Sequence, residues 1–147
     1  MTLCYLALGS NLKTSERQIR LAIARLRTLP STRVLEVAEL YKNKAWGRRT
    51  QPNFCNTVVS IRTNLTPEQL LAQCKKVENR QGRYRRVKYG ARTLDVDILF
   101  YGNRKINKPD LIIPHPRLHE RDFVLIPLQQ LLRPAKHRWT PQIKQRT

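Results

Sequence analysis

Glycine is scarce in this 147-residue sequence, which contains 5 glycines and no G-x-x-x-x-G-K-[ST] motif. The missing motif excludes a P-loop, in which the backbone amides of a glycine-rich turn hold phosphate groups. A protein-kinase signature is also absent. Any phosphate that this chain binds must therefore be held by side chains and metal ions rather than by a glycine-rich cradle.

Cysteine is equally sparse. Cys4, Cys55 and Cys74 are odd in number and too far apart in the sequence to form a metal-ligand pair. We therefore expect no disulfide framework, a cytoplasmic location, and three thiols that behave as small buried side chains. No apolar run approaches the roughly 20 residues of a membrane span, and no signal peptide is expected before the first strand.

Acidic residues are few. The 10 Asp and Glu residues face 29 Lys and Arg residues, which gives a formal net charge of +19. Such an excess indicates an anionic partner, but it does not choose between nucleic acid, a membrane surface and a phosphorylated substrate. The hydrophobic content of 40% is sufficient for one domain that spans residues 1–147.

The apolar periodicity predicts strands over 2–9, 32–43, 54–64 and 94–101, and helices over 15–29 and 66–80. Ser15 is the expected N-cap of the first helix, and Thr66, Pro67 and Gln69 form the start signal of the second. The order βαββαβ predicts an α+β, ferredoxin-like antiparallel sheet with its helices on one face. We expect the Pro-rich C-terminal extension, residues 112–132, to wrap the domain with short helical turns rather than to build a second core.

Two carboxylates stand at the entrance of the last predicted strand. Leu94, Val96 and Ile98 alternate on one face, so Asp95 and Asp97 share the other face, about 6–7 Å apart along the strand. A solvated strand face, a pair of general acid and base groups as in glycosidases, and a Mg²⁺ site all fit this pattern.

The basic residues upstream favour the metal site. Between Arg80 and Arg92 there are several cations and no acidic residue, in the order Arg80, Arg83, Arg85, Arg86, Lys88 and Arg92. A neutral sugar does not explain this charge. A polyphosphate does, because arginines hold phosphate oxygens and Mg²⁺ bridges phosphates to carboxylates. A solvated run of charges is the remaining alternative.

Several motifs together resemble a known family. They are ALGSNL at 7–12, QPNFCN at 51–56, ENRQGRYR at 78–85, GARTLDVDILFYG at 90–102 and PHPRLHERDFVLIPL at 114–128. This combination resembles 6-hydroxymethyl-7,8-dihydropterin pyrophosphokinase of folate biosynthesis. The resemblance implies the ferredoxin-like fold and transfer of the β,γ-diphosphate of ATP to the pterin hydroxymethyl group, which leaves AMP. It also implies a monomer that acts on small molecules, without a membrane or a nucleic acid.

The resemblance also implies residue roles. Asp95 and Asp97 would coordinate two Mg²⁺ ions, and Arg83 and Arg92 would be further catalytic residues. The implied ATP contacts are Lys75, Glu78, Arg83, Arg85, Arg92, His115 and Arg121. The implied pterin contacts are Asn43, Trp46, Phe54, Asn56, Asp95 and Phe123. In this set, Phe54 and Phe123 sandwich the ring, Asn56 binds its edge, and Asn43 and Trp46 stand where the family usually has a Thr-x-Pro-like run.

The competing interpretation is a ferredoxin-like nucleic-acid-binding module. The RNA-recognition motif shares the βαββαβ order but needs an aromatic R/K-G-F/Y-G/A-F-V-x-F/Y run, which the strands at 54–64 and 94–101 lack. Two carboxylates on the binding face would also repel RNA unless a metal ion covered them. A relative that has lost catalysis is a third possibility, and the presence of Asp95, Asp97 and Arg92 argues against it.

Overall fold

The computed structural model describes residues 1–11, 14–43, 54–82 and 94–132; the side chains of Asn43 and His119 are also outside the described set. In chain order the elements are β1 (Thr2–Ser10), α1 (Ser15–Leu26), β2 (Thr32–Val37), β3 (Tyr41–Asn43), β4 (Phe54–Thr63), α2 (Pro67–Arg80), β5 (Asp95–Tyr101), β6 (Ile106–Lys108), β7 (Leu111–Ile113), a 3₁₀ turn (Leu118–Glu120) and α3 (Asp122–Leu132).

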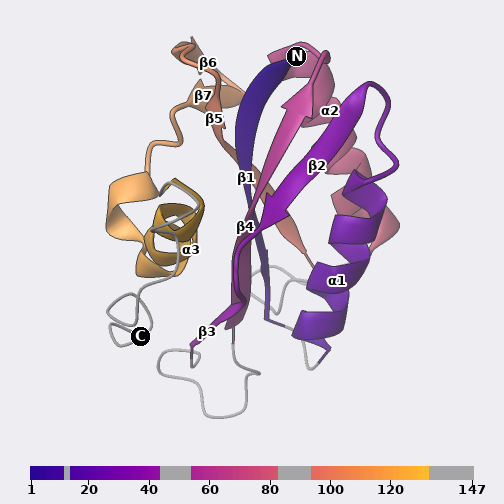
Figure 1. The fold of residues 1–147 in the computed structure, drawn as a ribbon, viewed down its shortest axis with the longest axis vertical. Coiled ribbons are helices and arrows are strands. Elements are labelled where there is room, and N and C mark those ends of the chain that lie inside the picture. Colours follow the sequence, from indigo (N-terminus) through magenta and orange to yellow (C-terminus); the bar gives the residue numbers. More distant parts are fainter. Residues whose placement is uncertain (12–13, 44–53, 83–93, 133–147) are drawn as a thin grey trace.

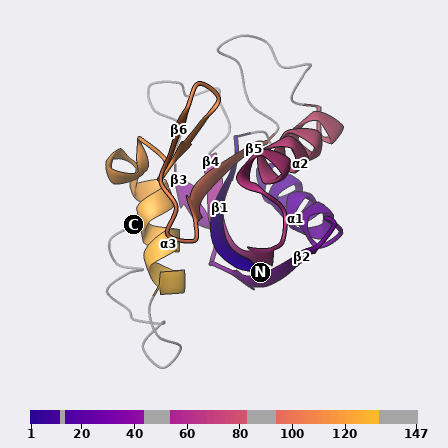
Figure 2. The same ribbon diagram turned by 90° about the horizontal axis from the view of Figure 1, so that it is seen from above.

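The fold is a mixed α/β arrangement around one antiparallel sheet. The strand order is β2-β4-β1-β5, and the short β3 pairs with β4 at the end where β2 has stopped. Helices α1 and α2 cover one face of this sheet, and α3 lies on the other face (Figure 1, Figure 2). The strands β6 and β7 form a separate hairpin.

The larger core lies between the sheet and the helices α1 and α2. It contains Leu6 and Leu8 of β1, Ile19 of α1 and Leu70 of α2, all at most 1% exposed. Helix α2 starts as predicted, because the Thr66 side chain accepts a hydrogen bond from the Gln69 amide while the Gln69 side chain accepts one from the Thr66 amide. The three cysteines are free and buried, also as predicted.

The C-terminal extension differs from the prediction. Residues 122–132 form a three-turn helix, α3, despite Pro127 inside it, and this helix builds a second apolar cluster on the opposite face of the sheet. The cluster joins Leu128 and Leu131 of α3 to Val58 of β4 and Leu99 of β5. The expectation of short turns without a second core was therefore wrong, because the other face of the sheet is apolar enough to bury a helix.

Two local predictions also need correction. Residues 32–43 form two strands instead of one, because residues 38–40 lie opposite only residues 57 and 58 of β4, so the pairing register shifts there. At this shift the Ala38 amide still donates to the Val58 carbonyl, while the Ala38 carbonyl accepts a hydrogen bond from the Thr57 hydroxyl. The N-cap position of the first helix is Thr14 rather than Ser15, since the Thr14 carbonyl accepts the first helical hydrogen bond, from Gln18; the Thr14 side chain makes no capping hydrogen bond.

Strand β5 contains a β-bulge, and the residues around it pack into both apolar cores. Tyr5 pairs with Phe100 while the next residue of β1, Leu6, pairs with Ile98, so Leu99 is an extra residue. Ile98 and Tyr101 lie in the larger core, whereas Leu99 lies in the second cluster with Phe100 packed against it. The bulge explains why the sequence is apolar without alternation from 98 to 101.

Candidate active site

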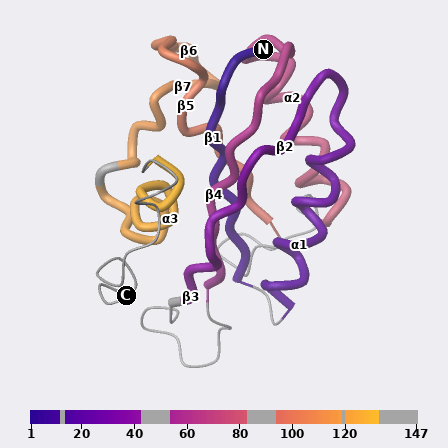
Figure 3. The backbone as a smooth tube through the Cα atoms, in the orientation of Figure 1, coloured from indigo at the N-terminus to yellow at the C-terminus, as the bar shows by residue number. Residues whose placement is uncertain are grey.

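The predicted site residues of the strands meet on the face that α3 only partly covers. Gly9 of β1 pairs with Asn56 of β4 on one side and with Asp95 of β5 on the other, so these residues form a row across the sheet. The next row along the strands joins Val58, Ala7 and Asp97 in the same way. Both rows lie toward the end of the sheet near β3, which Figure 3 shows at the bottom.

The two carboxylates keep the orientation that the sequence predicts. Val96 and Ile98 are 5% and 4% exposed in the larger core, so Asp95 and Asp97 project from the opposite face, and both are partly exposed. The backbone between them is held from the α2 side of the sheet, where the Val96 amide donates a 2.7 Å hydrogen bond to Oε2 of the buried Glu78. Helix α2 thereby fixes the strand segment that carries both carboxylates.

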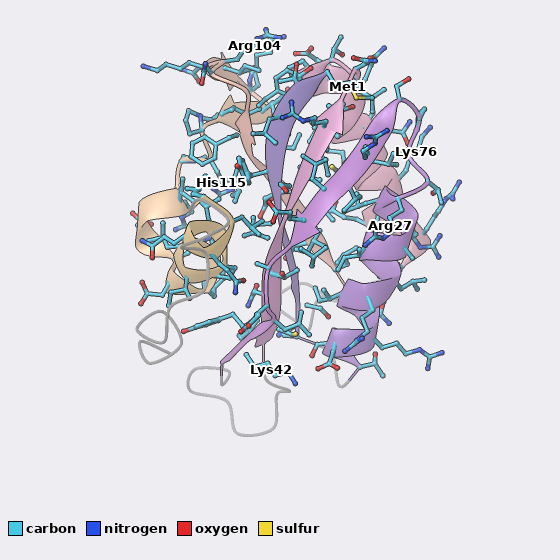
Figure 4. All side chains as sticks on the ribbon, in the orientation of Figure 1. Met1, Arg27, Lys42, Lys76, Arg104 and His115 are labelled. Carbon is cyan, nitrogen blue, oxygen red and sulfur yellow. The ribbon has the colours of Figure 1, made fainter. Side chains whose placement is uncertain are left out.

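His115, labelled in Figure 4, lies close to Asp97. Its amide donates to the Leu99 carbonyl of β5, and its Nε2 lies 4.0 Å from Oδ2 of Asp97. Its Nδ1 accepts a hydrogen bond from the Arg117 amide, so in the neutral ring the proton is on Nε2 and faces Asp97. Burial lowers the pKa of His115 below its ordinary value; the nearby charges of Arg121 and Arg117 act in the same direction and Asp97 opposes them.

Asn56 carries the most informative polar atom on this face. The residue is 7% exposed, and its Nδ2 has no hydrogen-bond partner within the part of the chain that the structure describes. A buried amide N–H without a partner is costly, and it is usually explained by a bound group or a water molecule. The Nδ2 group of Asn56 is therefore suited to donate a hydrogen bond to a polar atom of a ligand.

The aromatic candidates come from the same side of the sheet. Phe54 opens β4, is 36% exposed, and shares the face of Asn56 because the two residues are two positions apart. Phe123 lies in the first turn of α3 and packs against the second apolar cluster. The guanidinium of Arg121 lies 5.7 Å from the centre of the Phe123 ring. Arg121 thus brings a positive charge to this part of the site.

Other predicted residues are not gathered on this face. Lys75 and Glu78 belong to α2, on the other side of the sheet; Lys75 is exposed and Glu78 is buried against β5. Asn43 ends β3 and pairs in register with Phe54, which places its backbone at the site. The remaining predicted contacts lie outside the described residues: Trp46, Arg83, Arg85 and Arg92.

Two features of the site were not predicted from the sequence. Gly9 was interpreted only as the end of a strand, although it lies between Asn56 and Asp95. Glu78 was matched to the nucleotide, and its contact with the β5 backbone was not foreseen. A glycine close to the end of an otherwise apolar strand is a signal of close packing that could have drawn attention to Gly9.

Two searches of the described residues bear on other kinds of site. No group of three or more His, Cys, Asp or Glu side chains that could hold a metal ion occurs among them. None of the helices in the same residues has the length and apolar content needed to cross a bilayer.

Two known proteins with similar sequences carry the same name. A 2-amino-4-hydroxy-6-hydroxymethyldihydropteridine pyrophosphokinase of Haemophilus influenzae is 42% identical over 131 residues, which are 89% of this chain and 82% of the relative. The Bacillus subtilis protein of the same name is 40% identical over 129 residues, covering 88% of this chain and 77% of the relative.

Solved structures support the fold. A crystal structure of HPPK-DHPS in complex with substrates superposes with a TM-score of 0.61 at 14% identity, covering 85% of this chain and 39% of that chain. Plasmodium falciparum HPPK-DHPS gives a TM-score of 0.58 at 16% identity with the same coverage. This chain thus spans well under half of those longer chains. Residues 5–133 match the sequence profile of the 7,8-dihydro-6-hydroxymethylpterin-pyrophosphokinase family, and the chain therefore belongs to this family.

Proposed function

We propose that this chain transfers the β,γ-diphosphate of ATP to the hydroxymethyl group of 6-hydroxymethyl-7,8-dihydropterin, giving AMP and the pterin diphosphate in folate biosynthesis. The family membership supports the reaction class. The observation that carries the proposal is the row of Asn56, Gly9 and Asp95 across the partly open face, with Asp97 one row away. It combines a polar anchor for a heterocycle with carboxylates for a metal–nucleotide complex.

The carboxylates fit the Mg²⁺ that the family implies. Mg²⁺ binds oxygen ligands and commonly uses one or two carboxylates together with substrate phosphates, so the donor set of Asp95 and Asp97 is suitable for two ions shared with ATP. The Asp97 side chain is 42% exposed and can be reached by a ligand. When bound, the ions would neutralise charge on the phosphates. His115 lies next to this pair, with its Nε2 4.0 Å from Oδ2 of Asp97, so it can contact a phosphate held there.

The pterin is proposed to bind over β4. Its ring would lie between Phe54 and Phe123, because a flat heteroaromatic ring stacks well on aromatic faces. The Asn56 amide offers one donor and one acceptor to the ring edge, and its Nδ2 is the buried atom that lacks a partner within the described residues. Asn43, Trp46 and Asp95 are proposed as further pterin contacts on the strength of the family motif.

In the reaction, the hydroxymethyl oxygen attacks the β-phosphorus of ATP. A new O–P bond forms, the hydroxyl proton is lost, and the bond between the α,β-bridging oxygen and the β-phosphorus breaks, so that AMP leaves. The side chains of His115 and Arg121 are proposed to bind phosphate. Arg83, Arg85 and Arg92 complete the proposed ATP contacts, and Arg83 and Arg92 are proposed to act in the transfer itself. Lys75 and Glu78 are proposed as ATP contacts from the family motif alone, since both belong to α2 on the other side of the sheet and Glu78 binds the Val96 amide.

The same proposal covers the finer description of the fold. The order β2-β4-β1-β5, with α1 and α2 on one face, supports a ferredoxin-like topology for the first part of the chain. We propose one pyrophosphokinase domain over residues 1–147 that acts as a monomer.

The test is to identify the nucleotide product by chromatography after incubation of the chain with ATP, Mg²⁺ and the dihydropterin. AMP that appears only when the pterin is present supports the proposal, whereas ADP as the product would refute it. Asp97→Asn is expected to abolish the reaction without changing the melting temperature. Asp110→Asn is the matched control, because Asp110 is an exposed carboxylate outside the site. Full turnover by Asp97→Asn would refute the metal assignment.

A further inference from the structure

Gly9 occupies the centre of the row that joins Asn56 to Asp95. Leu8 faces the larger core, so the vacant side-chain position of Gly9 faces the opposite side, where Asn56 and Asp95 lie. A β-carbon built on Gly9 would lie 2.6 Å from Oδ1 of Asn56 and 3.7 Å from its Cγ. The end of the Asn56 side chain therefore lies in the space that any other residue at position 9 would fill.

Backbone geometry does not require glycine at this position. The glycines with positive φ in the described residues are Gly82 and Gly102, so Gly9 has a backbone conformation that any residue can adopt. The next residue of β1 on the same face, Ala7, has a side chain and is buried in the second cluster. The need for glycine at position 9 is consequently a need for space above the strand.

That space determines how the Asn56 amide is presented. With Oδ1 above Gly9, the amide lies across β1, and its other end, Nδ2, is the atom without a partner among the described residues. We propose that Gly9 is a positioning residue for the pterin: the absence of its side chain seats the Asn56 amide so that Nδ2 meets the ring edge. This inference rests on the proposed function, specifically on Asn56 as a pterin contact.

The proposal predicts a change in binding without loss of the fold. The atom nearest to an added β-carbon is the end of a side chain, which can rotate away, so Gly9→Ala is expected to displace the amide and to leave the sheet intact. Gly102→Ala is the matched control. Its β-carbon would lie 2.9 Å from Cγ2 of Thr2 and its φ is +52°, so it strains the protein away from the site.

The experiment is a double-mutant cycle on pterin affinity. The dihydropterin is titrated by calorimetry in the presence of Mg²⁺ and α,β-methylene-ATP into the wild type, Gly9→Ala, Asn56→Ala and the double variant. We expect each single variant to raise the Kd at least tenfold and the double variant to match Asn56→Ala, because Gly9 acts through Asn56. The side-chain amide resonance of Asn56 should shift in Gly9→Ala and stay in place in Gly102→Ala.

The outcomes separate the inference from the proposed function. An unchanged Kd for Asn56→Ala refutes the role of Asn56 in the proposed function. If Asn56→Ala weakens binding and Gly9→Ala does not, the inference about Gly9 is wrong while the proposed function stands. If Gly9→Ala weakens binding by the same factor in the Asn56→Ala background, Gly9 acts on the structure in general, and the inference is overturned as well.

Discussion

Glu78→Ala is expected to destabilise the protein by about 3 kcal/mol. Loss of the carboxylate leaves the buried Val96 amide without this acceptor, which costs about 1–3 kcal/mol. The one buried methylene that Glu78→Ala removes costs about a further 0.8 kcal/mol, and the better helix propensity of alanine recovers only a few tenths of a kcal/mol. For a chain of this length, a loss of this size lowers the melting temperature by roughly 6–12 °C.

Two further variants make this prediction specific. Glu78→Gln keeps an oxygen that can accept from the Val96 amide, so we expect it to retain most of the stability that Glu78→Ala loses. Glu68→Gln is the control on the same helix, since Glu68 is 52% exposed in a surface ion pair with Lys108 and its substitution should leave the stability close to that of the wild type. Urea denaturation gives the free energies of unfolding. Equal stabilities for Glu78→Ala and the wild type would refute the reasoning.

Other predictions concern the cores, the site and the thiols. Leu99→Ala should cost about 2–5 kcal/mol by urea denaturation, whereas Leu132→Ala, at a 53% exposed position, should cost less than about 0.5 kcal/mol; equal losses would contradict the second core. Phe123→Ala should raise the pterin Kd in calorimetry, and an unchanged value would exclude the sandwich. Burial raises the pKa of the Cys4 thiol to about 12, so it stays protonated at pH 8 and should react with Ellman's reagent only after unfolding. Rapid reaction of Cys4 in the native state would contradict this.

Local signals made part of the fold predictable. The start of α2 is encoded in adjacent residues, where Thr66, Pro67 and Gln69 satisfy the first amides of the helix. The alternation around Asp95 and Asp97 was enough to predict the face of each side chain, because a strand has a fixed period of two. Both predictions needed only the sequence within one element.

Features that depend on distant segments were not predictable. Helix α3 is stabilised by packing against a sheet face that comes from other parts of the chain. Pro127 inside the segment makes a helix difficult to predict from the sequence alone. The clash that any side chain at position 9 would make with Asn56 depends on strand register, which joins residues far apart in the sequence. The register shift between β2 and β3 likewise depends on pairing with β4, a later part of the chain. The sequence predicts the candidate residues, whereas their neighbours across the sheet come only from the tertiary structure.

The extra residue in β5 separates two functions that share one strand. Because Leu99 and Phe100 both lie opposite Tyr5, the pairing is regular on each side of them, and removal of Leu99 would leave every other residue of β5 on its present face. Loss of Leu99 would keep the orientation of the carboxylates, but it would alter the packing of α3 and remove the carbonyl that accepts the His115 amide. The bulge therefore separates the start of this strand, which carries the carboxylates, from the residues that pack against α3.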